Sequence, residues 1–321
     1  MPRGHARGAR RSSIDGVNPV RYTCQDPVAV AHRFGAGLHP ENSLTAISNA
    51  WALGVRWFET DARASADGVA VLHHDRTLAR LFGRDEAVAD LTWDQLRSLR
   101  TPAGDRLLRP RDVLEMFPGA RFAIDVKDPA VLPALLGDVR RAGAAERVCL
   151  AGAPDALLAR AAAAEPGLRT ALGWRALTAL VAAARLAPPA RLPTLRARAR
   201  AVPAVPVLEV PAVTPVPVVH RWAHVPDRLL GAGVLTDAVV RRADQLGVHV
   251  MAWTVDQPDR MHHLLDMGVR GIITDRPDLL RDVLRSRGVW DLPEDPGPND
   301  GGGRSTGGPR GSSPRVRVVA T

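Results

Sequence analysis

Residues 57–62 of this chain read Trp-Phe-Glu-Thr-Asp-Ala. The aromatic and apolar residues predict a β-strand, and Glu59 and Asp61 face the same side of it because they are two positions apart. Residues 122–127 read Phe-Ala-Ile-Asp-Val-Lys and repeat the pattern with Asp125 and Lys127. An isolated pair of this kind is most often a solvated strand edge, but its recurrence on a second strand indicates a shared site.

On both sides of these stretches, short β-branched runs alternate with amphipathic, Ala/Leu-rich segments, which is typical of βα units around a parallel sheet. Helix signals fill the gaps: Asn42 or Ser43 caps a helix that ends near Gly54, Thr236 caps another, and Pro277 opens the last. Eight strands suit a closed barrel, so the predicted class is α/β, a (β/α)8 TIM barrel. The predicted strands are Val28–Arg33, Trp57–Ala62, Phe122–Val126, Val148–Ala151, Thr170–Trp174, Val205–Val210, Val248–Val255 and Gly271–Thr274.

Three segments fall outside this alternation. Val69–His74 predicts an extra strand, too soon after the second for a crossover helix and hence a local hairpin. Residues 76–109, with a helix start near Thr92, predict a small insertion subdomain after the second strand, over the C-terminal mouth. Residues 1–26 predict a disordered basic tail and residues 289–321 a disordered Gly/Pro-rich tail, which leaves residues 27–288 for the barrel.

The composition excludes several classes of protein. The net charge of +9 comes almost wholly from scattered arginines, which we interpret as compositional bias, and no nucleic-acid-binding motif accompanies them. No apolar run reaches the roughly 18 residues of a membrane helix, and no apolar segment follows the first arginines, so a cytoplasmic location is expected by default. Peripheral membrane contact is left open. Cys24 and Cys149 form no disulfide or zinc pattern, and Cys149 is expected in the core.

Ionisable residues follow the first three predicted strands, where catalytic groups of such barrels lie. Three carboxylates at one mouth, Glu59, Asp61 and Asp125, require a cation, and oxygen ligands without cysteine favour Mg2+ or Ca2+ over zinc. Lys127 is the single lysine among 43 basic residues. A compact ammonium fits beside a metal and a phosphate oxygen where a guanidinium is too bulky; chance survival of one surface lysine is the alternative.

Two histidines stand at the ends of strand-like runs. A lone histidine is usually structural, but His32 and His74 at the rim of one metal site could divide the acid and base roles of phosphoryl transfer. Arg33 could neutralise the phosphate. His220 and His224 are expected on a helix or loop surface.

The motifs together resemble those of the glycerophosphodiester phosphodiesterase family and run in order from about residue 28 to 285. Each alone is weak, but the set is specific. The matching motifs are His32-Arg33-x-Gly35, Glu41-Asn42-Ser43, Glu59-x-Asp61, His74-Asp75-x-Thr77-Leu78-x-Arg80, Asp125-x-Lys127, Trp253-Thr254-Val255 and Gly271-Ile272-Ile273-Thr274-Asp275-x-Pro277.

The resemblance implies a barrel with an insertion after the second strand. It also implies a phosphoric diester hydrolase of lipid and glycerol metabolism that cleaves small glycerophosphodiesters, with one divalent cation, to sn-glycerol 3-phosphate and an alcohol. In similar enzymes a histidine removes the proton of the glycerol 2-hydroxyl, which attacks phosphorus to give a cyclic phosphate that water opens. Carried over by position, the roles are metal binding by Glu59, Asp61 and Asp125, phosphate binding by Arg33 and Lys127, general base and acid by His32 and His74 in either order, and support by Glu41 and Asn42. Trp253 lines the pocket or packs in the core, with equal weight.

Two positions depart from the family pattern. Phe34 stands where the family usually has glycine, so we expect its ring to narrow the pocket. Asp125 stands where the third metal ligand is usually glutamate, which leaves the choice of cation open.

Three alternatives accompany this prediction. The first is a lysophospholipase D-like enzyme for long-chain lysolipids, which needs an apolar path at the mouth. The second is a barrel that has lost catalysis and only binds phosphorylated ligands. A nucleic-acid-binding protein is the third, and it rests only on the basic chain ends.

Overall fold

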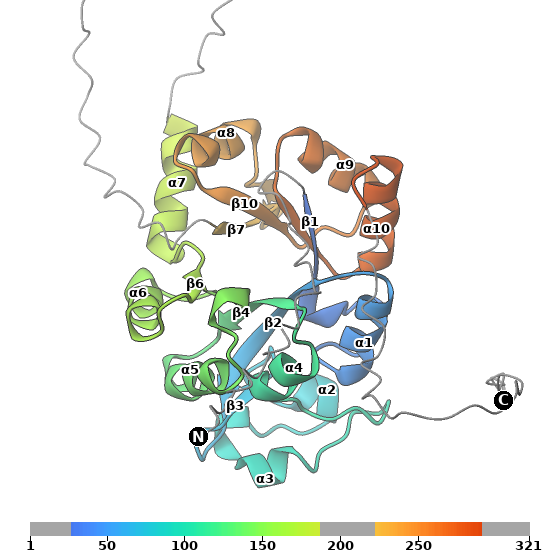
Figure 1. The fold of residues 1–321 in the computed structure, drawn as a ribbon, viewed down its shortest axis with the longest axis vertical. Coiled ribbons are helices and arrows are strands. Elements are labelled where there is room, and N and C mark those ends of the chain that lie inside the picture. The colour runs from blue at the N-terminus through green and yellow to red at the C-terminus, as the bar shows by residue number, and fades with distance from the viewer. Residues whose placement is uncertain (1–26, 187–221, 291–321) are drawn as a thin grey trace, which may run out of the picture. The chain divides into compact units, whose positions relative to one another are not determined.

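The computed structural model describes residues 27–186 and 222–290. Eight parallel strands follow one another in the order β6-β5-β4-β2-β1-β11-β10-β7. The circle closes between β6 and β7, where Ala171 forms a parallel bridge with Trp222 and Leu172 donates its backbone N–H to the Trp222 carbonyl at 2.8 Å. Figure 1 shows the helices as a ring around these strands. The predicted (β/α)8 TIM barrel is confirmed.

The elements have the following bounds. The barrel strands are β1 (Val28–Ala31), β2 (Trp57–Ala64), β4 (Arg121–Val126), β5 (Val148–Ala151), β6 (Arg169–Thr170), β7 (Trp222–Pro226), β10 (His249–Trp253) and β11 (Gly271–Thr274). Outside the circle, β3 (Ala70–Leu72) pairs antiparallel with β2, and β8 (Arg228–Leu229) pairs antiparallel with β9 (Ala232–Gly233). The helices are α1 (Leu44–Ala52), α2 (Ala79–Phe82), α3 (Trp93–Leu96), α4 (Pro110–Met116), α5 (Leu132–Arg141), α6 (Asp155–Ala164), α7 (Trp174–Leu186), α8 (Asp237–Gln245), α9 (Pro258–Asp266) and α10 (Pro277–Ser286).

Side-chain caps fix several helix starts where the sequence predicts them. Ser43 accepts the backbone N–H of Ala46 at the start of α1, and Thr236 accepts that of Val239 at the start of α8. Pro277 occupies the first position of α10, where its missing N–H costs no hydrogen bond. Because α1 and α8 return the chain to the N-terminal end of the barrel, β2 and β10 run parallel to the barrel strands before them.

Strand register decides where the polar side chains meet. Asp61 on β2 pairs with Asp125 on β4, and Ala31 on β1 pairs with Phe58 on β2. His32, the residue after β1, therefore comes beside Glu59. Because neighbouring parallel strands end together, side chains that are distant in the sequence gather at the C-terminal mouth.

The barrel interior is apolar below that mouth. A buried cluster fills it from four strands, and larger clusters lie between the strands and the surrounding helices. The interior cluster consists of Val30, Trp57, Met251 and Ile273. Cys149 is also buried, as predicted. The charged residues of the mouth thus lie next to a layer of apolar side chains inside the barrel.

The predicted strands Val28–Arg33 and Val248–Val255 run past β1 and β10, which end at Ala31 and Trp253. The prediction Thr170–Trp174 is too long, because β6 ends at Thr170 and Trp174 is already the first residue of α7. The predicted strand Val205–Val210 lies outside the described residues. The sequence analysis did not predict β7, because histidine and proline interrupt its apolar residues.

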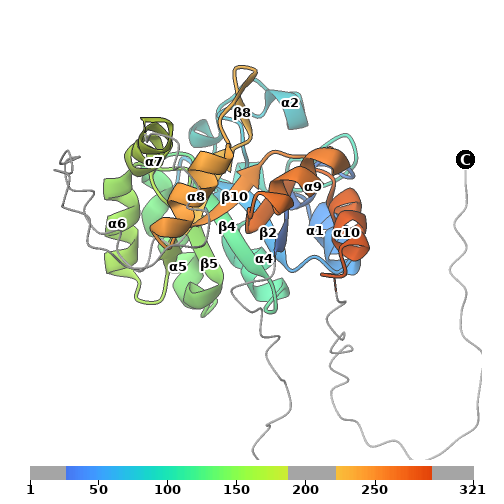
Figure 2. The same cartoon turned by 90° about the horizontal axis from the view of Figure 1, so that it is seen from above.

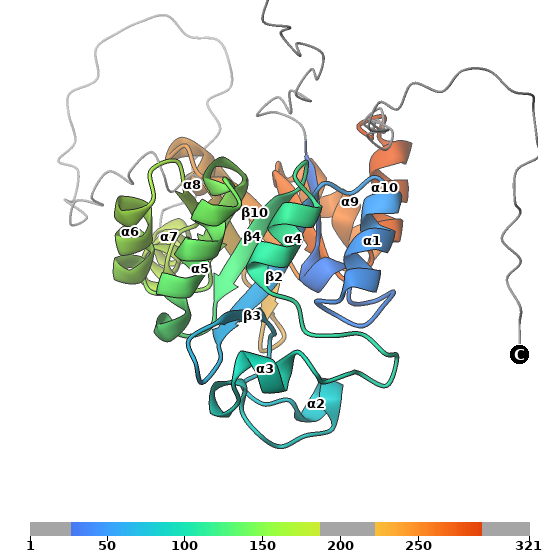
Figure 3. The same ribbon diagram turned by 60° about the horizontal axis from the view of Figure 1, so that its bottom comes forward.

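The segment after β2 has its own small core. Val69–His74 contains β3, so the predicted hairpin is confirmed. Figures 1 and 3 place α2, α3 and β3 together on one side of the barrel. The predicted insertion, residues 76–109, takes part in a separate buried cluster made of Val71, Leu78, Val88, Leu91, Leu96 and Leu107.

The predicted tails, residues 1–26 and nearly all of 289–321, lie outside the described residues. Among the helices of residues 27–186 and 222–290, none combines the length and the apolar character needed to cross a membrane.

Candidate active site

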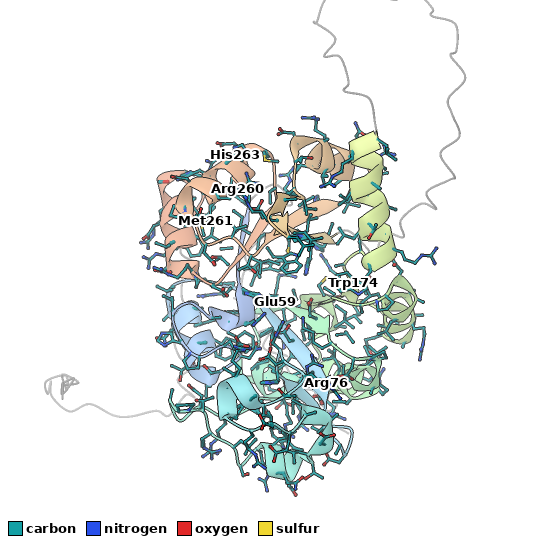
Figure 4. All side chains as sticks on the ribbon, turned by 180° about the vertical axis from the view of Figure 1, so that it is seen from behind. Glu59, Arg76, Trp174, Arg260, Met261 and His263 are labelled. Atoms are coloured by element: carbon teal, nitrogen blue, oxygen red, sulfur yellow. The ribbon has the colours of Figure 1, made fainter. Side chains whose placement is uncertain are left out.

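A cavity of about 140 Å³ opens at the C-terminal mouth. Eight of the ten predicted site residues line it, and Glu41 and Asn42 lie behind them. Figure 4 looks onto this end of the barrel, with Glu59 near its centre and Trp174 at the rim. A second hollow, of about 430 Å³ near Arg287, has no imidazole or carboxylate in its lining. The eight lining residues are His32, Arg33, Glu59, Asp61, His74, Asp125, Lys127 and Trp253.

Three carboxylates form the centre of this cavity. Ligand oxygens of Glu59, Asp61 and Asp125 lie within 4.8 Å of one another. Burial and the neighbouring charge of Asp61 raise the pKa of Glu59 to about 8. Burial alone would also raise the pKa of Asp61, but the Lys127 ammonium, 2.8 Å away, lowers it. The proton that this crowding favours therefore belongs on Glu59.

Lys127 joins two of the carboxylates. Its Nζ lies 2.8 Å from Oδ1 of Asp61 and 3.1 Å from Oδ2 of Asp125. Burial alone would lower the pKa of Lys127, but the two carboxylates raise it well above its usual range, so the side chain is a permanent cation. Its one positive charge offsets only part of the negative charge of Glu59, Asp61 and Asp125.

Gly152 makes room for Asp125. It follows β5 with a φ of 67°, and a Cβ atom there would lie only 2.5 Å from Cγ of Asp125. Any other residue would push Asp125 away from Asp61. The sequence analysis assigned no role to Gly152, because its contact with Asp125 depends on the pairing of β5 with β4.

The carboxylate cluster fits a hard divalent cation. Its donors are all oxygen atoms from two adjacent strands, and Lys127 offsets only part of their charge. The raised pKa of Glu59 expresses the same shortage of positive charge. Glu59, Asp61 and Asp125 are the residues that would hold the ion.

His32 is oriented by a carboxylate that the sequence analysis assigned no role. Its Nδ1 lies 2.7 Å from Oδ1 of Asp275, and its Nε2 lies 3.8 Å from Oε2 of Glu59. Because a carboxylate only accepts, Nδ1 carries the proton and Nε2 is left toward the cavity. Burial alone would lower the pKa of His32, but Asp275 and Glu59 raise it. Asp275 is fixed by Asp256, which accepts its backbone N–H at 2.8 Å.

His74 repeats this arrangement on the next loop. Its Nδ1 lies 2.7 Å from Oδ1 of Asp75, which Arg80 holds at 2.6 Å. Arg63 donates to the His74 carbonyl at 2.9 Å and fixes the backbone there. The preceding His73 points the other way, buried with Nε2 3.0 Å from the Thr77 carbonyl. Of the adjacent histidines, only His74 reaches the cavity.

The loop after β1 is held in a strained conformation. Arg33 and Phe34 have φ values of 46° and 72°, in the left-handed region where side chains cost roughly 1 kcal/mol or more each. The backbone N–H of Arg33 donates to Oε2 of Glu59 at 3.0 Å, and the N–H of Asn42 donates to the Arg33 carbonyl at 2.9 Å. The carboxylate cluster therefore also anchors this loop.

Glu41 and Asn42 brace the site from behind. Glu41 accepts from Arg33 at 3.1 Å and from Arg80 at 2.7 and 2.8 Å. The amide of Asn42 donates to Oδ2 of Asp61 at 3.3 Å and accepts from Thr60 at 2.7 Å. Arg33 and Asp61 are thereby set in place, with Nε of Arg33 3.7 Å from the Asp61 carboxylate.

The expectation that Phe34 narrows the pocket is wrong. Its side chain is fully buried and packs edge-on against Phe58 and Phe122, with ring centroids 6.0 and 6.3 Å apart. The left-handed backbone turns the ring away from the cavity and into the core between strands and helices.

An apolar wall flanks the charged centre. Trp253 lies on it, with 36% of its surface exposed, so the structure favours the pocket over the core for this residue. Trp174, at the start of α7, is 52% exposed. The other apolar residues of the wall are Leu172 and Leu177.

His224 also lines the cavity, so its predicted place on a helix or loop surface is wrong. It lies on β7, and its Nε2 is inaccessible to solvent and has no hydrogen-bond partner. Burial lowers its pKa, so the ring is neutral near pH 7. Alternation within Trp222–Pro226 would have placed this histidine inward, had the strand been recognised.

Comparisons with known proteins agree with this geometry. The model of the "Glycerophosphoryl diester phosphodiesterase family" matches residues 32–279. "Probable glycerophosphodiester phosphodiesterase 2" of Mycobacterium tuberculosis is 39% identical over 280 residues, which cover 82% of this chain and 93% of that protein.

Solved structures share the fold. A glycerophosphoryl diester phosphodiesterase domain from Mycobacterium tuberculosis has a TM-score of 0.62 and 22% identity, covering 81% of this chain and 99% of that one. A phosphodiesterase from Oleispira antarctica, solved with the product sn-glycerol 3-phosphate, has a TM-score of 0.61 and 16% identity, covering 81% of this chain and 97% of that one. The family match and the mycobacterial relative together span most of the chain, which therefore belongs to the glycerophosphoryl diester phosphodiesterase family.

Proposed function

We propose that this protein hydrolyses glycerophosphodiesters to sn-glycerol 3-phosphate and an alcohol. The observation that carries the proposal is one cavity lined by three carboxylates, an ammonium and two carboxylate-oriented imidazoles. The relative from Oleispira antarctica, solved with sn-glycerol 3-phosphate, supports the same product. The proposed setting is lipid and glycerol metabolism, and a cytoplasmic location stays a prediction from the sequence.

Lys127 and Arg33 bind the phosphate in this proposal. Both are positively charged side chains that line the cavity beside Asp61. They neutralise the negative charge of the phosphodiester and of the transition state on the attacked phosphorus. Lys127 also lowers the pKa of Asp61 and so keeps that carboxylate ionised.

His32 and His74 transfer protons. One Nε2 takes the proton of the glycerol 2-hydroxyl, whose oxygen attacks phosphorus while the bond to the alcohol breaks. The other imidazole protonates the leaving alcohol, and a cyclic phosphate results. In the second step the imidazole that gave up its proton takes one from an attacking water, the bond from phosphorus to the 2-oxygen breaks, and the other imidazole returns a proton to that oxygen. Asp275 and Asp75 accept a hydrogen bond from Nδ1 of His32 and His74, which leaves Nε2 of each ring for the substrate.

A divalent cation, Mg2+ or Ca2+, is proposed at Glu59, Asp61 and Asp125. When bound, it supplies Lewis-acid stabilisation of the charged phosphoryl oxygens. The side chain of Asp125 is shorter than the glutamate usual in this family. It reaches the other two carboxylates because β4 lies beside β2 and because Gly152 leaves space for it. Residues 76–109 are proposed as an insertion beside the mouth, tied to it through the pairs of Arg80 with Glu41 and Asp75.

A second substrate class is favoured by the apolar wall. Leu172, Trp174, Leu177 and Trp253 give one side of the cavity the character that a long-chain lysophospholipid requires. A lysophospholipase D-like activity would use the same charged centre on a phosphodiester whose glycerol carries a long acyl chain. The relative turnover rates of glycerophosphodiesters and lysophospholipids decide between these two substrate classes.

The first prediction concerns substrate and metal together. With added Mg2+ or Ca2+ we expect release of glycerol 3-phosphate from a panel of glycerophosphodiesters that includes glycerophosphocholine, followed by a coupled enzymatic assay. EDTA should abolish turnover and readdition of the cation should restore it. Faster turnover of lysophosphatidylcholine, followed by choline release because its other product is lysophosphatidic acid, would reassign the substrate class. Full activity in EDTA would remove the metal from the carboxylates, and no hydrolysis at all would indicate a barrel that only binds.

The second prediction concerns proton transfer. His32→Ala and His74→Ala should each lower kcat by about a hundredfold or more, given the usual contribution of a positioned acid or base. Circular dichroism should show the fold intact. His263→Ala, on the exposed face of α9, is the control and should retain full activity. Near-normal turnover in either active-site variant would refute its role.

The third prediction concerns the solitary lysine. Lys127→Arg keeps the charge, but a planar guanidinium cannot take the place of an ammonium 2.8 and 3.1 Å from two carboxylates. We expect kcat/KM to fall by about a hundredfold, as for other small displacements in active sites. Wild-type turnover of Lys127→Arg would show that only the charge matters.

A further inference from the structure

A short hairpin projects from the barrel mouth. It consists of β8 and β9 and begins two residues after β7, at the end of the barrel where the cavity opens. Figure 2 shows β8 and α2 rising beyond the ring of helices on the same side. The tip carries Leu229, which is 61% exposed, and Leu230, which is fully exposed.

The fold does not explain these leucines. Leu229 pairs with Ala232, so Leu230 and Gly231 form a two-residue turn, with φ values of 49° and 81°. Turns with two positive φ values prefer asparagine followed by glycine, because leucine is strained there. Leu230 therefore costs backbone energy and also leaves its apolar side chain in water. A leucine at this position suits a hairpin tip that is removed from water by a partner.

The surroundings of the tip are basic. Arg228 lies on the hairpin itself, and Arg185 of α7 donates to the Gly233 carbonyl at 3.2 Å. Within residues 27–186 and 222–290, neither arginine has a carboxylate partner. The acid at the hairpin base, Asp227, is neutralised by Arg260, whose Nε lies 3.1 Å from both of its oxygens. The tip thus combines two apolar side chains with unpaired positive charge.

We propose that this hairpin docks the protein on an anionic lipid bilayer. Leu229 and Leu230 enter the interfacial layer, and Arg228 and Arg185 face the acidic headgroups. The mouth then faces the membrane, with Trp174 and the apolar wall of the cavity on the same side. Docking itself does not depend on the proposed function, but the supply of lipid-derived glycerophosphodiesters from that surface does.

The test is vesicle sedimentation with a matched pair of variants. Wild-type protein should bind vesicles of phosphatidylcholine and phosphatidylglycerol in equal parts, and should bind less to pure phosphatidylcholine or at high salt. Leu229→Ser combined with Leu230→Asn should lower the partition coefficient about tenfold or more, because two apolar side chains are lost. Asparagine suits the turn, so folding is preserved. Met116→Gln, at the C-terminal end of α4 and hence at the opposite end of the barrel, should bind as wild type.

Three outcomes would overturn the proposal: absence of wild-type binding to anionic vesicles, equal binding by the double variant, or a dimer in size-exclusion chromatography that the double variant loses. The last would assign the tip to a second copy of the chain. Turnover of soluble glycerophosphocholine, measured on the same samples, should be equal in wild type and double variant. If neither protein hydrolysed glycerophosphocholine, the proposed function would be contradicted, but the vesicle measurements would still test the docking proposal.

A second inference rests on His224 alone. Its Nε2 is buried without a hydrogen-bond partner, which destabilises the folded protein unless a ligand completes the hydrogen bond. It is not part of the carboxylate cluster, and β7 stands three places from β4 in the barrel order. We infer that His224, which lines the cavity, binds a hydroxyl group of the substrate and acts as a specificity residue.

The test separates substrate binding from packing. His224→Leu should raise KM for glycerophosphocholine about tenfold or more while Mn2+ affinity is unchanged, since one substrate hydrogen bond is lost. His224→Gln, whose amide nitrogen reaches a similar position, should recover most of the loss. An unchanged KM in His224→Leu would overturn the inference, as would equal losses in both variants with a lowered Tm.

Discussion

Repulsion among three carboxylates within 4.8 Å of one another is the constraint on which the rest of this site depends. Two of them, Glu59 and Asp61, are almost completely buried, and water therefore cannot screen their charge. Lys127 offsets one charge, and crowding shifts Glu59 toward its protonated form. The proposed divalent cation would offset the charge that remains on these three carboxylates.

The same carboxylates organise the groups around them. Glu59 accepts the backbone N–H of Arg33 and so holds the strained loop that carries His32. Asp61 is bound by Asn42 and Lys127, and Asn42 in turn holds the Arg33 backbone. Strain of this kind persists only where surrounding contacts fix it. A bound cation that moved Glu59 or Asp61 would therefore also move this loop and the imidazole of His32.

The sequence predicted the barrel and most of the site because both depend on local patterns. Spacing of two on a strand placed Glu59 with Asp61, and capping residues located α1 and α8. Contacts between distant segments left no such pattern. Asp275 orients His32 across 243 positions, and Gly152 matters only because β5 lies beside β4.

Two further misses have physical causes. Phe34 was expected in the pocket because its side-chain size was considered without its backbone, whose left-handed φ turns the ring into the core. His224 was expected on the surface because β7 was not recognised, and a histidine and a proline among its five residues conceal the strand. Tertiary pairing with β10, in register over five residue pairs, overrides that weak local preference.

The placement of the cation is the central claim, and anomalous diffraction tests it most directly. Crystals soaked in Mn2+, which takes the same oxygen ligands, should give one strong peak bonded to oxygens of Glu59, Asp61 and Asp125. A peak elsewhere in the molecule, with these three carboxylates uncoordinated and Glu59 bonded only to the loop, would contradict it.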